Sequence, residues 1–127
     1  MFTRNSATLF DVSHMGQLML EGKDAAEFLE SIVPGNIKDL KDNKCRLTQF
    51  TNDHGGIMDD TVVTRKAQDK FYVVVNAGCC EQDLKHITAQ IEKFVSQGNG
   101  KDVEMTFMNH YSLVALQGPK SAEVLQS

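Results

Sequence analysis

Long apolar runs are missing from this sequence. No stretch of about 18 apolar residues occurs, so we expect no transmembrane helix and no membrane partner. The first six residues lack the apolar core of a secretory signal peptide, and we expect none here. What is present is ordinary for a globular domain: 127 residues, 41% of them hydrophobic and 24% charged. That length can bury one core of modest size.

Cysteines and basic clusters are also scarce. The three cysteines are Cys45 and the adjacent pair Cys79 and Cys80, which predicts reduced thiols rather than a disulfide framework. The absence of a CxxC pair and of a matching histidine spacing argues against a zinc site. Thirteen basic residues against seventeen acidic ones, with no basic run, argue against a nucleic-acid partner. No glycine-rich phosphate loop occurs, so a nucleotide-binding fold has no support.

Strand and helix patterns follow one another in the order β-α-β-β-β-α-β, followed by another strand and a last helix. Helices are predicted at residues 24–33, 81–95 and after Gly118-Pro119, and strands at 16–21, 46–51, 57–64, 71–75, 103–108 and 112–116. Residues 65–70 are predicted to turn, and Gly98-Asn99-Gly100 to end the second helix. Because βαβ units do not repeat, we expect an α+β fold: a ferredoxin-like, mainly antiparallel sheet with helices on one face.

Two adjacent carboxylates, Asp59 and Asp60, stand early in an otherwise apolar strand. Strand side chains alternate between faces, so the two point opposite ways, and Asp60 shares its face with Val62 and Thr64. A carboxylate on a buried or clefted face must be hydrogen-bonded, paired or shifted in pKa. The alternative is that both residues belong to the preceding turn and cap it. Their opposite directions argue against a shared two-aspartate metal site.

Asn76 ends the strongest predicted strand and shares a face with Tyr72 and Val74. Its amide offers both donors and an acceptor, as a pterin-like ring requires. The alternative is an ordinary turn residue. Should this strand pair with residues 57–64, Asp60 and Asn76 would line one surface.

Two further groups have both a chemical and a structural interpretation. His14, within the polar cluster at residues 11–15, suits a general base or a ligand contact, or simply a loop hydrogen bond; no Ser-His-Asp triad is supported. Cys79 and Cys80 precede a predicted helix, whose N-terminus lowers the pKa of a thiol. The alternative is a pair of small, half-buried structural thiols.

Five blocks, in order along nearly the whole chain, carry a family resemblance. They are residues 9–16 (LFDVSHMG), 50–60 (FTNDHGGIMDD) and 73–79 (VVVNAGC), then Lys85, then residues 115–119 (ALQGP). Together they resemble the glycine cleavage T-protein family of aminomethyltransferases. The resemblance implies a reaction in which an aminomethyl group arrives on the lipoyl arm of H-protein, ammonia is released, and tetrahydrofolate, a co-substrate, takes up the one-carbon unit.

The resemblance also implies roles for individual residues. By position, Asp60 matches the family's catalytic carboxylate, which orients the folate and assists proton movement, while Asp59 is its structural neighbour. Folate contacts are implied at Met15, Leu47, Val62, Thr64, Val74 and Asn76. Some relatives carry aromatic residues where Leu47 and Thr64 stand, so we expect weaker stacking on the folate here.

The family protein is much longer, so the resemblance implies that this chain is a fragment and is inactive alone. Residues 16–105 are expected to form the ferredoxin-like second domain. Residues 1–15 and 106–127 are expected to be pieces of a discontinuous first domain. The blocks favour a eukaryotic source, and hence the mitochondrial matrix; a bacterial source would imply the cytoplasm.

Two alternatives compete with this assignment. One is a folate-binding relative of the same superfamily, such as a folate-linked demethylating oxidase or an iron–sulfur assembly factor. The context of Asp60 favours the transferase, and the cysteine motif of the assembly factor is not visible. The other alternative is a non-catalytic α+β interaction module.

Overall fold

The computed structural model describes residues 1–98 and 101–127, and the chain divides into two compact units. The larger unit comprises Gly16–Asn109, and the smaller comprises Met1–Met15 with His110–Ser127. Asn99 and Gly100, part of the predicted helix end, lie outside the described residues. No helix in the described part of the chain has the length and apolar character needed to cross a membrane.

The larger unit contains a five-stranded sheet whose paired neighbours are all antiparallel. Its strands are β2 (Gly16–Glu21), β3 (Cys45–Thr51), β4 (Ile57–Ala67), β5 (Lys70–Val75) and β6 (Glu104–Phe107), in the spatial order β3-β4-β5-β2-β6. If the edge strand β3 is set aside, the remaining elements follow the β-α-β-β-α-β pattern of ferredoxin-like folds. The predicted α+β class is confirmed.

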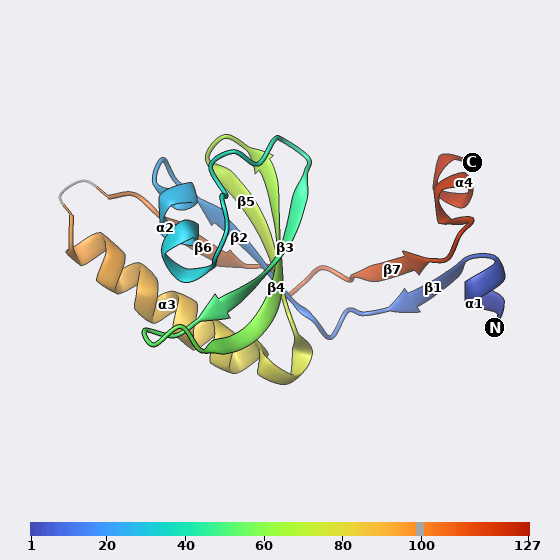
Figure 1. Cartoon of the computed structure of the whole chain (residues 1–127), viewed down its shortest axis with the longest axis horizontal. Helices are drawn as coiled ribbons and strands as arrows, with labels where there is room; N and C mark the ends of the chain where they lie inside the picture. Colours follow the sequence, from blue (N-terminus) through green and yellow to red (C-terminus); the bar gives the residue numbers. More distant parts are fainter. Residues whose placement is uncertain (99–100) are drawn as a thin grey trace. The chain divides into compact units, whose positions relative to one another are not determined.

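Two helices cover one face of this sheet, α2 (Ala25–Ile32) and α3 (Cys80–Ser96) (Figure 1). The 3–4 spacing of apolar residues in α2 gives it a single apolar face, and that face is buried at Ala25, Phe28, Leu29 and Ile32. The rings of Phe28 and Phe94 meet edge to face, with centroids 5.5 Å apart, and join α2 to α3. A short 3-10 turn, η1 (Ala77–Cys79), leads into α3.

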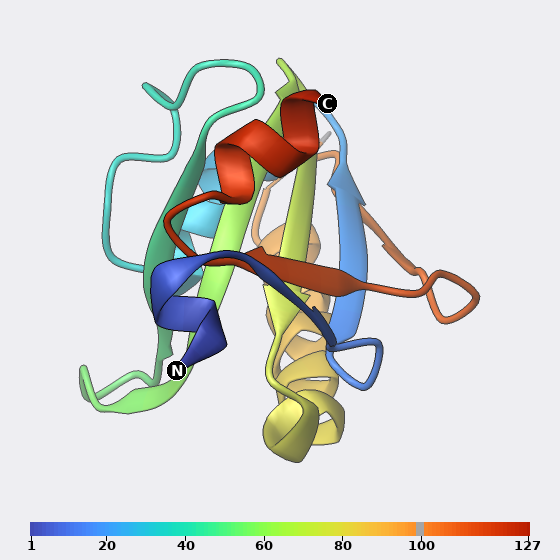
Figure 2. The same cartoon turned by 90° about the vertical axis from the view of Figure 1, so that its right-hand side faces the viewer.

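The alternation of side chains gives the sheet two different faces. On the helix-covered face, Val63, Phe71 and Val73 are fully buried. Thr61 is buried among them, and its hydroxyl donates to the carbonyl of Val74 (2.8 Å). In Figure 2 the strands run side by side with the two helices behind them. The core of this unit therefore lies between the sheet and the helices.

The smaller unit is built around a two-stranded antiparallel ladder, β1 (Thr8–Asp11) with β7 (Val114–Gln117). Short helices α1 (Phe2–Asn5) and α4 (Ser121–Gln126) flank it. Gly118 has φ 133°, and a Cβ there would come within 2.1 Å of the carbonyl oxygen of Ser6. Only glycine suits that backbone conformation and that close approach.

The predicted elements differ from the structure in three places. The predicted turn at 65–70 is wrong, since β4 continues to Ala67 and only Gln68 and Asp69 separate it from β5. Arg65 extends the strand because its guanidinium donates to the carbonyls of Lys38 and Leu40 (2.9 and 2.7 Å). Neither α1 nor β1 was predicted. Local patterns do not reveal β1 because it pairs with a strand at the opposite end of the chain.

Candidate active site

The two aspartates of β4 point to opposite faces, as the alternation predicts. Asp59 lies opposite the buried Phe50 in the ladder and is half-buried, whereas Asp60 lies opposite Gln49 and is exposed. Among the described residues, none hydrogen-bonds to the Asp60 carboxylate or forms an ion pair with it, although its backbone N–H donates to Asp59 (2.9 Å). The Asp60 carboxylate is therefore available to a ligand.

Asp59 connects β4 to the end of β5. Its Oδ1 accepts hydrogen bonds from the Asn76 side-chain amide (2.8 Å) and from the Asp60 N–H (2.9 Å). The same Asn76 amide lies 3.3 Å from the Asp60 carbonyl oxygen. The structure thus brings Asn76 to the aspartate pair, but it does so through Asp59 and the backbone rather than through the Asp60 side chain.

A third carboxyl group, Asp83 on α3, joins this cluster. Asp83 is 1% exposed, and its carboxyl group interacts with that of Asp59. Burial, reinforced by the Asp59 hydrogen bond and charge, raises the pKa of Asp83 to about 7. Burial alone would raise the pKa of Asp59 too, but hydrogen bonds from Asp83, Asn76 and the Asp60 N–H hold it below the usual value.

Sequence reasoning missed Asp83, although a signal was present. It lies four residues before the fully buried Ile87, and positions i and i+4 share a helix face. An acidic residue on the apolar face of a helix requires a partner. Following the apolar face of α3 one turn towards the start of the helix would have placed Asp83 on it.

Of the two interpretations of the cysteines at the start of α3, the structure favours structural thiols over activated ones. The negative charge of Asp59, together with burial and Asp83, raises the pKa of the Cys79 thiol. Burial and the Asp83 charge raise the pKa of the Cys80 thiol. These effects outweigh the helix N-terminus, so the structure favours the alternative of two structural thiols.

An apolar row crosses the sheet face opposite the helices. Leu47, Val62 and Val74 stand on adjacent strands β3, β4 and β5, directly paired as Leu47 with Val62 and Val62 with Val74. Leu47 is 75% exposed, and both valines are half-buried. Asp60 and Thr64 flank Val62 on the same face of β4. Five of the predicted folate-contact positions therefore lie in this unit, four of them on this face and Asn76 at the end of β5.

Met15, the remaining predicted contact, belongs to the smaller unit. Its N–H donates to the Val12 carbonyl (3.0 Å) in a turn. Nearby, Asp11 accepts the Ser13 N–H (3.0 Å), and His14 is exposed. Asp11 thus has a turn role, which is common for an aspartate.

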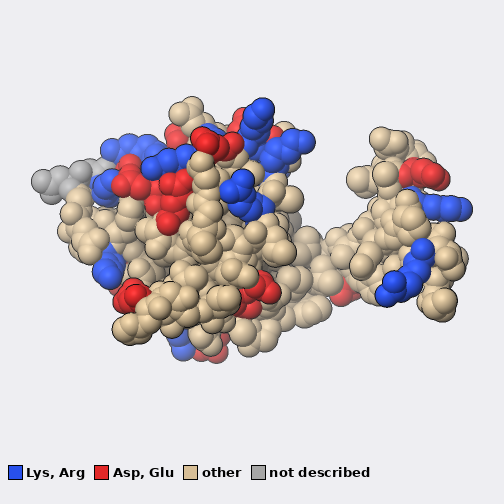
Figure 3. All heavy atoms as spheres, in the orientation of Figure 1, with Lys and Arg blue, Asp and Glu red and all other residues tan. Residues whose placement is uncertain are grey.

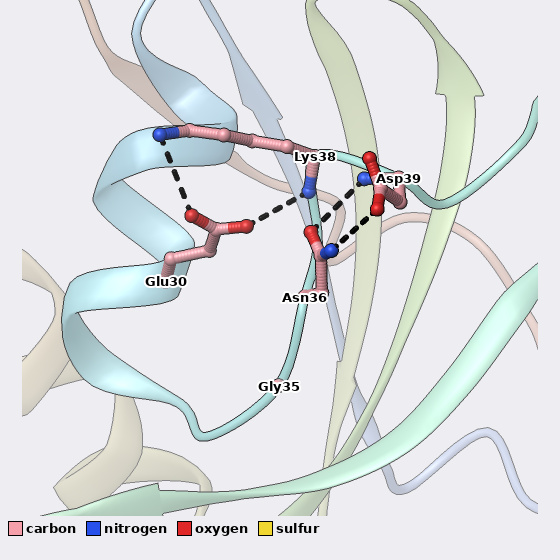
Figure 4. Close-up of a pocket in the computed structure, with 5 residues that line it drawn as sticks. All are labelled: Glu30, Gly35, Asn36, Lys38 and Asp39. Carbon is pink, nitrogen blue, oxygen red and sulfur yellow. Dashed lines mark hydrogen bonds and ion pairs between the residues drawn. The ribbon is translucent and has the colours of Figure 1, made fainter.

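Other polar features of the larger unit have structural explanations. The hollow in Figure 4 lies beside α2, where one oxygen of Glu30 accepts the N–H groups of Ile37 and Lys38 (both 2.9 Å) and its other oxygen pairs with the Lys38 ammonium (3.5 Å). These bonds hold the loop that follows α2. On the face shown in Figure 3, basic and acidic side chains of this unit are interspersed. Within the described residues, no group of three or more His, Cys, Asp or Glu side chains is placed to hold a metal ion.

The comparisons with known proteins agree on one family. Residues 1–127 match the family model described as the GCVT N-terminal domain. The chain is 47% identical over 123 residues to the mitochondrial aminomethyltransferase of Dictyostelium discoideum, and 43% identical over 125 residues to that of Homo sapiens. These alignments take in 97% and 98% of the chain but only 30% of each relative.

The structural comparison gives the same answer. The crystal structure of the glycine cleavage system aminomethyltransferase T from Bartonella henselae matches with a TM-score of 0.85 at 35% identity, covering 98% of this chain and 32% of that one. This chain therefore spans about a third of the length of the proteins it resembles. The family resemblance of its sequence blocks is confirmed, and the chain belongs to the GCVT N-terminal domain family.

Proposed function

We propose that this chain supplies part of the folate site of a glycine cleavage aminomethyltransferase. The proposed reaction transfers a one-carbon unit from the aminomethyl-lipoyl group of H-protein to tetrahydrofolate and releases ammonia. The names of the relatives support this assignment. The observation that carries it is the Asp60 carboxylate, unpartnered among the described residues, beside the apolar row of Leu47, Val62 and Val74 on one sheet face.

The residues of this face suit a flat ring that is rich in nitrogen. Leu47, Val62 and Val74 offer a continuous apolar strip on which such a ring can pack. The proposed contacts at Thr64 and Asn76 add polar groups near the strip. The contact at Met15 stays a prediction from the family resemblance. A largely apolar surface with a few polar groups is typical of small-molecule sites.

Asp60 is the proposed catalytic residue. An exposed carboxylate accepts N–H hydrogen bonds and holds or passes a proton, the task of a general acid or base. Its backbone is fixed by the Asp59 side chain, so the carboxylate keeps its position without having its own oxygens occupied. Orientation of two reactants accounts for much of the rate enhancement in reactions of this kind.

The domain organisation and the location belong to the same proposal. Residues 16–105 would form the second domain of the longer protein, and residues 1–15 and 106–127 would be pieces of its discontinuous first domain. The lipoyl group is carried by H-protein, the proposed protein partner. The relatives named here from Dictyostelium and human are mitochondrial, which supports the mitochondrial matrix for a eukaryotic source.

A chimaera tests the proposed activity. This chain replaces the matched 123-residue stretch of the Dictyostelium enzyme, and ammonia release is measured with aminomethylated H-protein and tetrahydrofolate. We expect activity in the chimaera and a loss of about a hundredfold or more after Asp60→Ala. Asp69→Ala, which alters an exposed aspartate in the β4–β5 turn, is the matched control and should leave the rate unchanged. A folded chimaera without activity, or an active Asp60→Ala variant, would contradict the proposal.

Calorimetry on the chain itself tests the folate site separately. Saturable tetrahydrofolate binding that is weakened by Asp60→Ala would support a preformed part of the site. Equal binding by the unmodified chain and the variant would show that Asp60 does not contribute to tetrahydrofolate binding.

A further inference from the structure

The cluster around Asp59 contains a carboxyl group that the proposed mechanism does not use. Asp83 is fully enclosed, and both of its carboxyl oxygens are buried, as is the Asp59 Oδ2. Among the described residues no donor group reaches any of these three oxygens. The carboxyl groups of Asp59 and Asp83 interact directly with each other, and each affects the pKa of the other.

Two carboxylates in such contact cannot both be ionised, because only a protonated carboxyl group has an O–H to donate. Among the described residues, no cation shifts the pKa of either acid. Cys79 and Cys80 lie close and are neutral thiols. The Asp59 charge, with burial and Asp83, raises the pKa of Cys79, and burial with Asp83 raises the pKa of Cys80. His86, one turn further along α3, is kept neutral by burial, which lowers its pKa.

The proton resides on Asp83 rather than on Asp59. Asp83 accepts no other hydrogen bond, whereas the Asp59 Oδ1 accepts two, from Asn76 and from the Asp60 N–H. Hydrogen bonds of this kind favour the ionised form of the carboxyl group that accepts them. The shifts of the two pKa values agree, with Asp83 raised to about 7 and Asp59 lowered.

We propose that Asp83 is a positioning residue for the candidate active site: its protonated carboxyl group donates to Asp59, which in turn fixes the Asn76 amide and the Asp60 backbone. The chain of contacts runs from α3 through β4 to the end of β5. The role assigned to Asp60 rests on the proposed function, but the acid pair itself does not.

This arrangement is sensitive to pH in the neutral range. When Asp83 loses its proton, two buried anions face each other and the donor to Asp59 disappears. The Asp59 side chain is then no longer fixed by Asp83. The Asn76 amide and the Asp60 N–H, which both donate to Asp59, lose an acceptor with a fixed position. We therefore expect the site to lose its geometry as the pH rises through about 7.

The first test uses this chain without any assay of function. Carboxyl carbon NMR gives the titration midpoint of Asp83 directly, and the side-chain amide signals of Asn76 report on its bond to Asp59. We expect an Asp83 midpoint near 7 and a parallel change at Asn76. In Asp83→Asn, whose amide still donates but does not ionise, the Asn76 signals should stay constant over the same range. A normal Asp83 midpoint, or Asn76 signals that ignore it, would overturn the proposal.

The second test uses the chimaera and its pH profile. Asp83→Asn should keep kcat/KM near the unsubstituted value and abolish the decline attributed to Asp83 ionisation. Asp83→Ala should lower kcat/KM by about tenfold to a hundredfold, since small misplacements near a reacting group have effects of this size. An Asp83→Asn profile identical to that of the unsubstituted chimaera would refute the positioning role. A chimaera inactive at every pH would instead count against the proposed function, and the NMR titration would still decide the acid pair.

Discussion

Asn76 donates its side-chain amide to Asp59 across 2.8 Å, and not to the carboxylate of the neighbouring Asp60. One aspartate of the pair therefore holds the end of β5, while the carboxylate of the other has no partner in the described part of the chain. Adjacent residues of a strand face opposite sides, so a single strand presents a half-buried acid that fixes Asn76 and an exposed acid to which we assign the proposed catalytic role.

Removing the Asn76 amide should destabilise the larger unit. Asn76→Ala leaves the half-buried Asp59 with one donor fewer, and the expected loss is about 1–3 kcal/mol in the free energy of unfolding. Urea denaturation measures it. In a double-mutant cycle with Asp59→Ala, the two substitutions should couple by at least about 0.5 kcal/mol, as contacting residues do.

Asn36 provides the matched control for that experiment. It also hydrogen-bonds to an aspartate, Asp39, but both residues are exposed. Asn36→Ala should change the stability by about 0.5 kcal/mol or less. Equal losses of stability at Asn36 and Asn76 would show that the bond to Asp59 stabilises the chain no more than an exposed hydrogen bond does.

Local patterns predicted the parts of this fold that depend on local physics. The spacing of Phe28, Leu29 and Ile32 predicted α2, and the alternation around Val62 predicted the two faces of β4. Patterns of this kind record which side of an element is buried. They do not record distant partners, which is why β1 was missed: its ladder with β7 joins Thr8 to Gln117.

The same limit applies to the candidate site. The sequence identified the aspartate doublet and Asn76, because a polar residue in an apolar strand stands out. It did not show that Asn76 would bond to Asp59, which depends on the backbone at the strand end. Nor did it show the contact of Asp83 with Asp59, because that contact depends on how α3 packs against the sheet.

Leu47 and Phe50 should respond in opposite ways to truncation. Leu47 is 75% exposed on the open face, whereas Phe50, three residues later on β3, is fully buried against the helices. Leu47→Ala should change the stability by less than about 0.5 kcal/mol, but weaken tetrahydrofolate binding several-fold. Phe50→Ala should cost about 3–5 kcal/mol. Urea denaturation and calorimetry separate the two effects, and a large stability loss at Leu47 would contradict its place on the open face.

Gly16 is expected to tolerate no side chain. A Cβ there would lie 2.5 Å from the Cys80 Sγ and 2.6 Å from the Val75 Cγ2, so Gly16→Ala should overpack the contact between β2 and α3. The expected cost is about 1–3 kcal/mol, measured by thermal or urea unfolding. Adding Cys80→Ala should recover part of it by removing one of the two clashes.

Gly78 is the control for Gly16. Within residues 1–98 and 101–127, no atom outside its chain neighbours lies within 4 Å of a Cβ built there. Gly78→Ala should therefore be neutral or stabilise by up to about 1 kcal/mol through the unfolded chain. If Gly16→Ala were equally harmless, the close packing of β2 against α3 would be wrong.

The stability of the chain should depend on Asp83 between about pH 4 and pH 7. In this range the folded chain keeps a proton on Asp83, whose pKa is raised to about 7, whereas the unfolded chain has released it. The folded state then binds more protons, so the free energy of unfolding falls as the pH rises. The contribution is complete below about pH 4 and is lost by about pH 7. At about 1.4 kcal/mol per pKa unit, the loss is at most about 4 kcal/mol.

Asp83→Asn isolates this contribution because the other titrating groups remain. Burial lowers the pKa of His86, which removes stability as the pH falls below its usual value, opposite in direction to Asp83. That effect is present in both proteins and cancels in the difference. Urea denaturation across the range should therefore show the unmodified chain losing stability relative to Asp83→Asn as the pH rises from about 4 to about 7. A difference that stays constant would mean that Asp83 has the same proton affinity in the folded and unfolded chains, and that the buried acid pair does not form.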